Sequence, residues 1–208
     1  TRTRRAHTHT HVLDIGSRQR ALNYRPGEYY SYTNTGYNLQ AILVERVSGM
    51  SLAAFTKARI FDPLGMASTQ WRDDFTRGVR DRAIAYSANR EGGWSTLMPF
   101  EDVHGNGGLL TTVEDLLRFT RNLETGQVGG PRFIEEMHRQ GILNSGQVIS
   151  YASGLQLGSY NGVPEVQHSG STAGYRGHLS RFPDQGIALA VMCNASTGNA
   201  GALLHEVA

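Results

Sequence analysis

The sequence predicts an α+β protein in which a mainly helical part precedes an antiparallel sheet. Up to about residue 149, apolar residues recur at the three- and four-residue spacing of amphipathic helices. From about residue 150 they occur in short runs separated by Gly, Pro, Asn and Asp, which is typical of successive strands. A block of helices followed by a block of strands is typical of α+β folds. With 208 residues, 39% of them apolar, the chain is long enough to bury a core.

The first part is divided into helices by capping residues and breakers. Ser51 and Thr111 or Thr112 are plausible N-caps, Pro131 is suited to a first turn, and Gly49 and Gly126 follow apparent helix ends. The run Asp62-Pro63-Leu64-Gly65-Met66 is expected to stop the third helix, because proline disrupts a helix interior. The expected helices span residues 8–22 (interrupted at Gly16), 35–47, 51–60, 111–123 and 131–139.

The second part, about residues 150–208, is expected to form strands and a closing helix. The strand-like runs are bounded by turn residues and the last one is strongly apolar. A further short strand-like piece lies at 83–86, within a stretch of loose pattern. The expected strands cover 155–157, 165–167, 177–182 and 186–193, and the closing helix covers 200–207.

Composition excludes several classes of function. The formal net charge of +2 gives no reason to expect a nucleic-acid partner. No apolar run approaches the ~18 residues of a membrane span. The single cysteine, Cys193, excludes an internal disulfide and a zinc cluster of thiolates. His7, His9 and His11 alternate, but without an acidic or cysteine partner nearby we expect no metal site and no cofactor.

Three places could carry chemistry. Tyr32 and Asn34, just before a helix, would present a phenol and an amide to a common cleft. At the end of a strand-like run, His168-Ser169-Gly170-Ser171 combines a strand edge with a glycine that permits close approach of a substrate, and the Ser171 N–H could donate to a developing oxyanion. The turn at 105–109 could form a pocket wall, although a plain loop is the favoured interpretation.

Taken together, these motifs resemble the serine β-lactamase and penicillin-binding-protein family. That family includes class C β-lactamases, D-amino-acid peptidases, family VIII esterases and low-molecular-weight penicillin-binding proteins. Tyr32-Thr33-Asn34 is similar to its second active-site motif, and His168-Ser169-Gly170 is similar to its third. Further similar runs are 29–39, 44–49, 60–66, 107–116 and 182–194, so that the resemblance covers about residues 17–208.

The resemblance implies a hydrolase that acts on ester, amide or β-lactam bonds through an acyl-enzyme. It implies that Tyr32 carries a proton and that Asn34 holds the catalytic lysine and a substrate amide. His168 would take the place of the usual lysine, and Ser169, Gly170 and Ser171 would bind the substrate and its oxyanion. Because a neutral histidine offers less fixed positive charge than lysine, the third motif favours an esterase or peptidase over an efficient β-lactamase.

The first motif of the family, Ser-x-x-Lys, is absent from these 208 residues. The only lysine is Lys57, and the position three residues before it is Ala54. We therefore expect residues 1–208 to be one partial domain of a truncated enzyme, inactive alone. The alternative is a natural pseudo-enzyme that binds a ligand without turnover.

The same resemblance gives expectations for partners and compartment. The substrate would be a small molecule or peptide with an acyl group. A sheet without its N-terminal strands would have an open edge, so we expect either self-association or a missing N-terminal segment to cover it. The sequence leaves the compartment unknown, and the resemblance favours a bacterial periplasmic or secreted protein.

Overall fold

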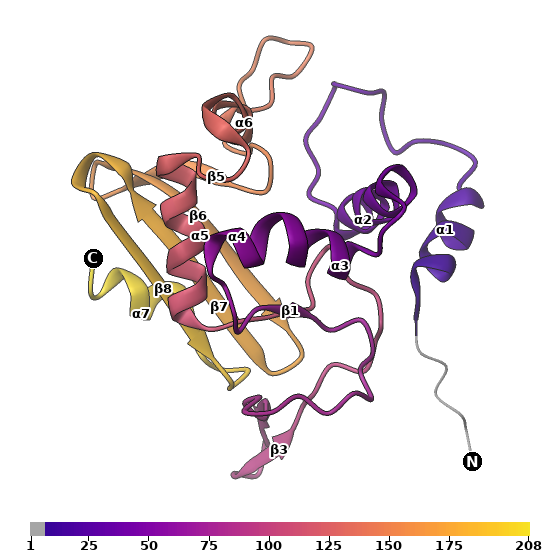
Figure 1. The fold of residues 1–208 in the computed structure, drawn as a ribbon, viewed down its shortest axis with the longest axis vertical. Coiled ribbons are helices and arrows are strands. Elements are labelled where there is room, and N and C mark those ends of the chain that lie inside the picture. Colours follow the sequence, from indigo (N-terminus) through magenta and orange to yellow (C-terminus); the bar gives the residue numbers. More distant parts are fainter. Residues whose placement is uncertain (1–6) are drawn as a thin grey trace.

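The main sheet has four antiparallel strands formed from the last quarter of the chain. In the computed structural model, which describes residues 7–208, the strands lie in the order β5 (Gln156–Tyr160), β6 (Val163–Thr172), β7 (Tyr175–Phe182) and β8 (Ile187–Cys193) (Figure 1). The register places Ser169 opposite His178, and His178 opposite Val191. Because opposed side chains share a face, Ser169, His178 and Val191 point to one side of the sheet, and the neighbouring His168 points to the other.

A helix covers each face of this sheet. Helix α5 (Val113–Thr125) packs through Leu123 against Leu155 and Val166. Helix α7 (Ala200–His205) contacts β7 and β8, and its Gly201 lies against His178. Val166 and His178 face opposite sides of the sheet, so α5 and α7 do as well. This is the antiparallel sheet flanked by helices that the sequence predicts.

The remaining helices lie beside the sheet, as Figure 1 shows. They are α1 (His9–Ser17), α2 (Asn34–Ser48), α3 (Leu52–Thr56), a π-helical turn (Lys57–Phe61), α4 (Asp62–Leu64) and α6 (Gly130–His138). Two sequence predictions are wrong here. The first helix ends at Ser17 rather than at residue 22. The third does not stop before Pro63, because Pro63 occupies the first turn of α4, where its missing N–H costs nothing.

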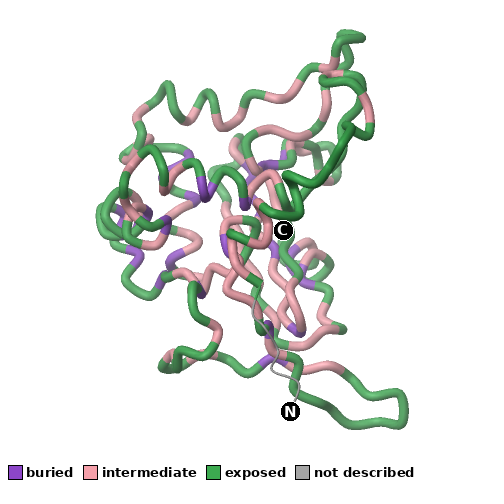
Figure 2. The backbone as a smooth tube through the Cα atoms, turned by 90° about the vertical axis from the view of Figure 1, so that its right-hand side faces the viewer, coloured by how far each residue is buried: buried purple, intermediate pink, exposed green. Residues whose placement is uncertain are grey.

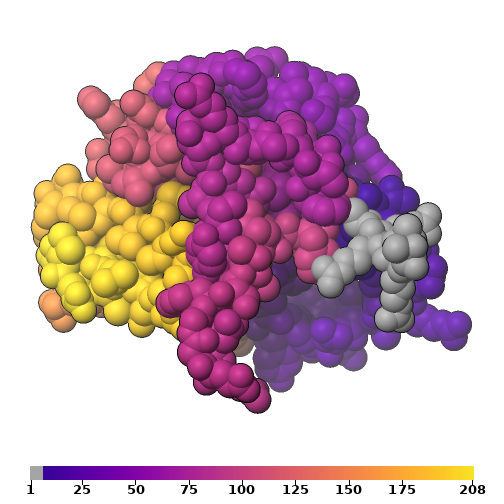
Figure 3. All heavy atoms as spheres, turned by 90° about the horizontal axis from the view of Figure 1, so that it is seen from below, coloured from indigo at the N-terminus to yellow at the C-terminus, as the bar shows by residue number. Residues whose placement is uncertain are grey.

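Two pairs of short strands connect the helices to the sheet. Strand β1 (Gln70–Trp71) pairs with β4 (Leu109–Leu110), and β2 (Tyr86–Ala88) pairs with β3 (Trp94–Thr96). The strand expected at 83–86 therefore begins only at Tyr86. Figure 3 shows the segment between β1 and β4, in magenta, lying between the yellow C-terminal part and the indigo N-terminal helices.

Strand β6 is longer than the sequence indicates. The expected strand covered residues 165–167, whereas β6 extends to Thr172 and contains the whole run His168-Ser169-Gly170-Ser171. The expected end of the strand at residue 167 is therefore wrong, whereas the run does lie in the last part of a strand. Polar side chains and a glycine conceal the strand in the sequence, and the pairing of residues 166–172 with β7 forms it in the structure.

Two apolar clusters form the core, and α5 joins them. One contains Phe61, Leu64 and Met66, and the other contains Leu123, Leu155 and Val166; Phe119 of α5 packs against both. Figure 2 shows the buried positions, in purple, gathered in the interior while the outer loops are exposed. Within the described residues, no helix has the length and apolar character that a membrane crossing requires.

Candidate functional site

A single cleft of about 510 Å³ collects all six predicted site residues. It lies between the start of α2, the loops around residues 101–108 and 150–151, and the second half of β6. The predicted residues that line it are Tyr32, Asn34, His168, Ser169, Gly170 and Ser171. Residues that the sequence did not single out also line it, and they include Tyr30, Arg72, Glu101 and Tyr151.

The second motif enters the cleft at the N-terminus of α2. Asn34 is the first residue of the helix and Thr33 its N-cap, so Tyr32 lies in the extended segment just before it. The Tyr32 side chain is exposed, and its ring lies 6.2 Å from that of His168 and 6.0 Å from that of Tyr151. Within residues 7–208, neither the Tyr32 hydroxyl nor the Asn34 amide has a hydrogen-bond partner, which leaves both groups available to a ligand.

His168 is held by two hydrogen bonds that fix its tautomer. Its Nδ1 lies 2.7 Å from the carbonyl oxygen of Ser169, and a carbonyl can only accept, so Nδ1 carries the proton. Its Nε2 lies 2.9 Å from the Tyr151 hydroxyl. With the proton on Nδ1, Nε2 is placed to accept the hydroxyl proton of Tyr151.

The surroundings of Tyr151 support this assignment. Burial, together with the neighbouring phenols of Tyr37, Tyr32 and Tyr30, raises the pKa of Tyr151 well above its ordinary value. The phenol therefore keeps its proton at neutral pH and can donate it to His168. This residue could not be predicted, because Tyr151 lies in a loop, 17 positions before its partner, and belongs to no motif.

A buried arginine supplies fixed positive charge to the cleft wall. Arg72 is only 2% exposed, and its guanidinium donates to the carbonyl oxygen of Glu101 at 2.7 Å and lies 3.5 Å from the Glu101 carboxylate. Burial lowers the pKa of Arg72 and the charge of Glu101 opposes this effect, but arginine stays protonated in proteins. The cleft thus has a cation although its third motif carries histidine in place of lysine.

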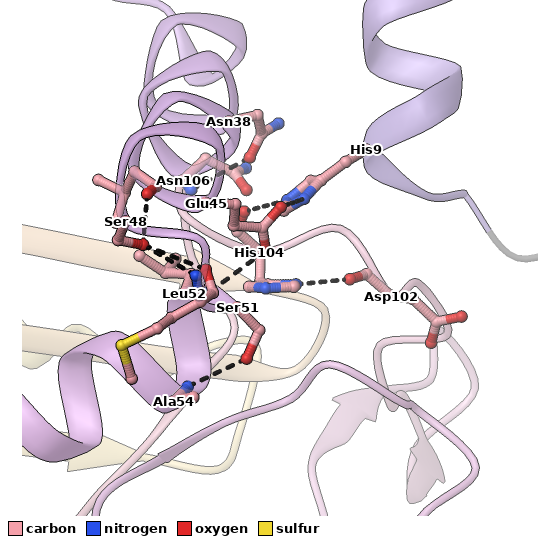
Figure 4. Close-up of polar contacts among 12 residues, drawn as sticks. His9, Asn38, Glu45, Ser48, Ser51, Leu52, Ala54, Asp102, His104 and Asn106 are labelled. Atoms are coloured by element: carbon pink, nitrogen blue, oxygen red, sulfur yellow. Dashed lines mark hydrogen bonds and ion pairs between the residues drawn. The ribbon is translucent and has the colours of Figure 1, made fainter.

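The turn at 105–109 forms a wall of the cleft, so the favoured interpretation as a plain loop is wrong. Asn106, Gly107 and Gly108 line the cleft, and the Asn106 N–H donates to the buried side chain of Asn38 on α2, at 3.2 Å (Figure 4). Gly105 has a φ of +114°, and a Cβ there would lie 2.7 Å from the Cβ of Ala41. Only glycine lets this turn approach α2 so closely.

The region of Lys57 cannot replace the missing first motif. Lys57 lies on the π-helical turn, is mostly exposed, and pairs with Asp62 at 2.5 Å, away from the residues that line the cleft. Position 54 is an alanine whose N–H donates to the N-cap Ser51, as Figure 4 shows. The described residues therefore hold two of the three motifs in one cleft and place their only lysine elsewhere.

His9 has partners that the sequence did not reveal. Glu45 and His104 come from distant segments, and the three side chains offer ligand atoms within 4.8 Å of one another (Figure 4). However, Nε2 of His9 is bonded to the His104 carbonyl at 2.7 Å, and Nδ1 of His104 to the Asp102 carbonyl at 2.8 Å. Glu45 in turn accepts from the Leu52 N–H. These bonds explain the cluster as a connection of α1 to α2 and to the cleft wall.

Comparison with known proteins gives one consistent family. The family model described as Beta-lactamase matches residues 7–207. Among curated proteins, the chain is 30% identical over 187 residues to penicillin-binding protein 4* of Bacillus subtilis (strain 168), covering 82% of this chain and 41% of that protein. It is 25% identical over 175 residues to a D-aminopeptidase of Gluconobacter oxydans (strain 621H), covering 84% of this chain and 33% of that protein. The chain thus spans well under half the length of these relatives.

Solved structures show the same fold. The octameric penicillin-binding protein homologue from Pyrococcus abyssi superposes with a TM-score of 0.78 at 29% identity, covering 88% of this chain and 43% of that one. A D-stereospecific amidohydrolase from Streptomyces superposes with a TM-score of 0.83 at 21% identity, covering 97% of this chain and 61% of that one. At that lower identity the second match speaks for the fold alone.

Proposed function

The chain belongs to the Beta-lactamase family of serine hydrolases and penicillin-binding proteins, and we propose that its cleft is the second- and third-motif half of an acyl-transfer active site. The observation that carries the proposal is that Tyr32, Asn34 and the run His168–Ser171 line one cleft although more than 130 residues separate the two motifs. Such a site cleaves an ester or amide through an acyl-enzyme formed on a serine.

The open edge of β6 is suited to binding the acyl group. Strand β5 pairs with β6 only as far as Gln167, so in the described part of the chain β6 has no neighbour on that side from His168 onward. Unpaired backbone N–H groups at this edge can donate to a substrate carbonyl, and that of Ser171 is our candidate for half of an oxyanion hole. Gly170, which has no side chain, leaves room for the substrate to approach.

The other residues have roles in proton transfer and orientation. The Tyr32 hydroxyl is the proton carrier between the attacking serine and the leaving group. The Asn34 amide orients the substrate, and Tyr151 holds the His168 ring in the orientation in which Nδ1–H is bonded to the Ser169 carbonyl. The His168 ring, held in this way, acts by positioning the substrate rather than by its charge.

We propose amides and esters of D-amino acids as the substrate class. Curated relatives are named D-aminopeptidases, and the identity of about 25% makes this a proposal for the present chain. The Glu101 carboxylate in the cleft supports it, since an amide or ester of an amino acid carries an ammonium group that this anion attracts. A neutral His168 gives less attraction to the carboxylate of a β-lactam than lysine would.

The covalent step needs a serine and a lysine that these residues do not contain as Ser-x-x-Lys. We propose that the motif is contributed by further chain in the complete enzyme. Intact-mass spectrometry of the 208-residue chain, with a penicillin and with an activated D-amino-acid ester, should show no adduct. The protein encoded by the whole gene should form a stoichiometric acyl adduct, and a Ser→Ala change in its Ser-x-x-Lys should abolish it.

The alternative is a pseudo-enzyme that binds a ligand in the same cleft without turnover. A gene that encodes no Ser-x-x-Lys, together with binding of a D-amino-acid amide by the chain, would favour it. A stoichiometric adduct on the 208-residue chain itself would contradict both interpretations of the missing motif, and peptide mapping would then identify the new nucleophile.

The exposed surface supports self-association. Leu39, Leu43 and Val47 form an apolar row on α2 that is largely exposed, and Ile187 and Met192 are exposed on the edge strand β8. The related protein from Pyrococcus abyssi is octameric, and we propose that this chain associates with further copies of itself. Light scattering that finds only a monomer over a wide range of concentration would contradict this.

A further inference from the structure

A second polar cluster lies on the other side of the sheet from His168. Glu165 of β6, His178 of β7 and His205 at the end of α7 offer one ligand atom each, and these atoms lie within 4.8 Å of one another. Glu165 is 6% exposed and His178 is 8% exposed, so both are more than nine-tenths buried. His205 is partly buried, and its ring stacks on that of Tyr160 at 4.1 Å between centroids.

The buried His178 has a nitrogen that nothing in the described chain satisfies. Its Nε2 is inaccessible to solvent and has no hydrogen-bond partner. Such a nitrogen costs free energy unless it gains a hydrogen-bond partner or binds a cation. Burial, and then the proximity of His205, lowers the pKa of His178, so the ring is in the neutral form that binds metals.

The buried carboxylate is also short of positive charge. One oxygen of Glu165 accepts the Ser180 hydroxyl and lies 2.8 Å from Nε2 of His205. The ion pair with His205, which exists only if that ring is protonated, is the sole one that Glu165 makes among residues 7–208. A buried carboxylate without a stable counter-charge is costly. Arg181 follows Ser180 on β7, but it forms its ion pair with Glu124 on α5 and not with Glu165.

We propose that Glu165, His178 and His205 bind a zinc ion, or a divalent metal of similar preference, between the sheet and the closing helix. Two imidazoles and one carboxylate form a common ligand set for zinc. Ligand atoms about 2.1 Å from one tetrahedral ion lie roughly 3.4 Å apart, so ligand atoms within 4.8 Å of one another need only small side-chain movements. An ion bound through Nε2 of His178 satisfies that nitrogen and the charge of Glu165 at once.

The role of this metal is structural. Each ligand comes from a different element, so the ion joins α7 to two strands of the sheet. Ser180 hydrogen-bonds to the Glu165 carboxylate and Tyr160 packs on His205, which are contacts that orient metal ligands. The cluster of His9, Glu45 and His104 differs, because one nitrogen of each ring and one carboxylate oxygen are hydrogen-bonded to backbone groups and neither ring has a buried nitrogen without a partner. It therefore serves as an internal control.

The experiment measures metal binding directly. The chain is stripped with a chelator, dialysed against Zn²⁺ and analysed by elemental mass spectrometry, and its melting temperature is recorded with and without metal. We expect one equivalent of zinc. At free zinc about one hundredfold above Kd, Tm should rise by roughly 5–10 °C. Mg²⁺, which prefers oxygen ligands, should have no such effect.

Variants locate the site. His205→Gln and Glu165→Gln should weaken zinc binding more than tenfold, whereas the matched His9→Gln should leave it unchanged. If a variant does not fold, ¹⁵N-detected NMR of the histidine rings in the unmodified chain decides instead: zinc should shift His178 and His205 but not His9 or His104. Absence of zinc from the unmodified chain, or zinc binding that is lost in His9→Gln and kept in His205→Gln, overturns the proposal.

Discussion

At the scale of single residues, the cleft depends on the hydrogen bond between the Tyr151 hydroxyl and Nε2 of His168, which holds the imidazole in place. His168 belongs to a recognisable motif, and its position on a strand could be expected from the sequence. The tautomer of His168 could not, because it depends on Tyr151 and on the carbonyl of Ser169. Hydrogen bonds between distant residues exist only once the chain has folded. The sequence therefore predicted which residues line the cleft better than it predicted their tautomers and hydrogen bonds.

The first prediction concerns the pH dependence of stability. The pKa of Tyr151 is raised in the folded chain, mainly by burial, whereas in the unfolded chain it lies near 10. The folded state therefore holds this proton more tightly, and the stability from it is complete below pH 10 and is lost as the pH rises beyond. In urea denaturation between pH 8 and pH 11, the original chain should lose more stability than Tyr151→Phe.

The same variant tests the hydrogen bond itself. Below pH 9, Tyr151→Phe should be less stable by about 0.5–1.5 kcal/mol, the usual net value of one hydrogen bond. The His168 ring should also become mobile between tautomers, which the ¹⁵N shifts of its nitrogens report. Tyr29→Phe is a suitable control because Tyr29 is exposed and lies outside the cleft. Equal pH profiles for the two variants would contradict the assignment.

At the scale of elements, the sequence predicted whether a segment forms a helix or a strand better than it predicted where that element ends. Residues that act locally, such as the N-cap Ser51 and the terminating Gly49 and Gly126, marked helix ends correctly. Pro63 was expected to end a helix, but it lies in the first turn of one. Proline is found in both positions, and the π-helical turn that precedes α4 was not predictable from the sequence. β6 was underestimated because its second half is defined by pairing with β7 rather than by its own pattern.

The second prediction is that the cleft wall requires glycine at one position and tolerates a side chain two residues later. At Gly105, a Cβ would meet Ala41 at 2.7 Å and the Tyr37 carbonyl at 3.0 Å, in a backbone conformation that only glycine adopts readily. Gly105→Ala should cost about 2–4 kcal/mol. At Gly107 nothing lies within 4 Å, so Gly107→Ala should change stability by less than about 1 kcal/mol.

Urea denaturation of the two variants side by side measures the difference. If both alanine variants were equally stable, the close approach of the turn to α2 would be wrong, and so would the explanation of this cleft wall. Gly107 lines the cleft, whereas Gly105 faces α2. We therefore expect Gly107→Ala to weaken ligand binding more than Gly105→Ala, the reverse of their order in stability.

At the scale of the whole molecule, the family order of the motifs made the α+β fold predictable. The cleft could be anticipated for the same reason, since the two motifs that line it were both recognisable. The division of the chain at about residue 150 stays a prediction. The contacts that join the helical part to the sheet were not foreseen, because they involve residues from separate segments, such as Arg181 of β7 and Glu124 of α5.

Asp115 joins α5 to Ser68 and Thr69 and gives the last prediction. It is 1% exposed; one carboxylate oxygen accepts the Ser68 N–H and the Thr69 hydroxyl, both at 2.8 Å, and the other accepts Arg118 at 2.6 Å. An asparagine has only one accepting oxygen and would turn an amide toward donors, so Asp115→Asn should cost about 2–4 kcal/mol. The adjacent exposed Glu114→Gln should stay within about 0.5 kcal/mol.

Because α5 belongs to both core clusters, this loss should be felt across the molecule. Phe119, one turn beyond Asp115, packs against the cluster of Phe61 and against that of Leu123. Fluorescence of Trp71, which packs on the first cluster, and circular dichroism of the sheet should therefore report one transition, shifted equally in Asp115→Asn. A shift in the fluorescence alone would show that the two parts unfold separately and that α5 does not couple them.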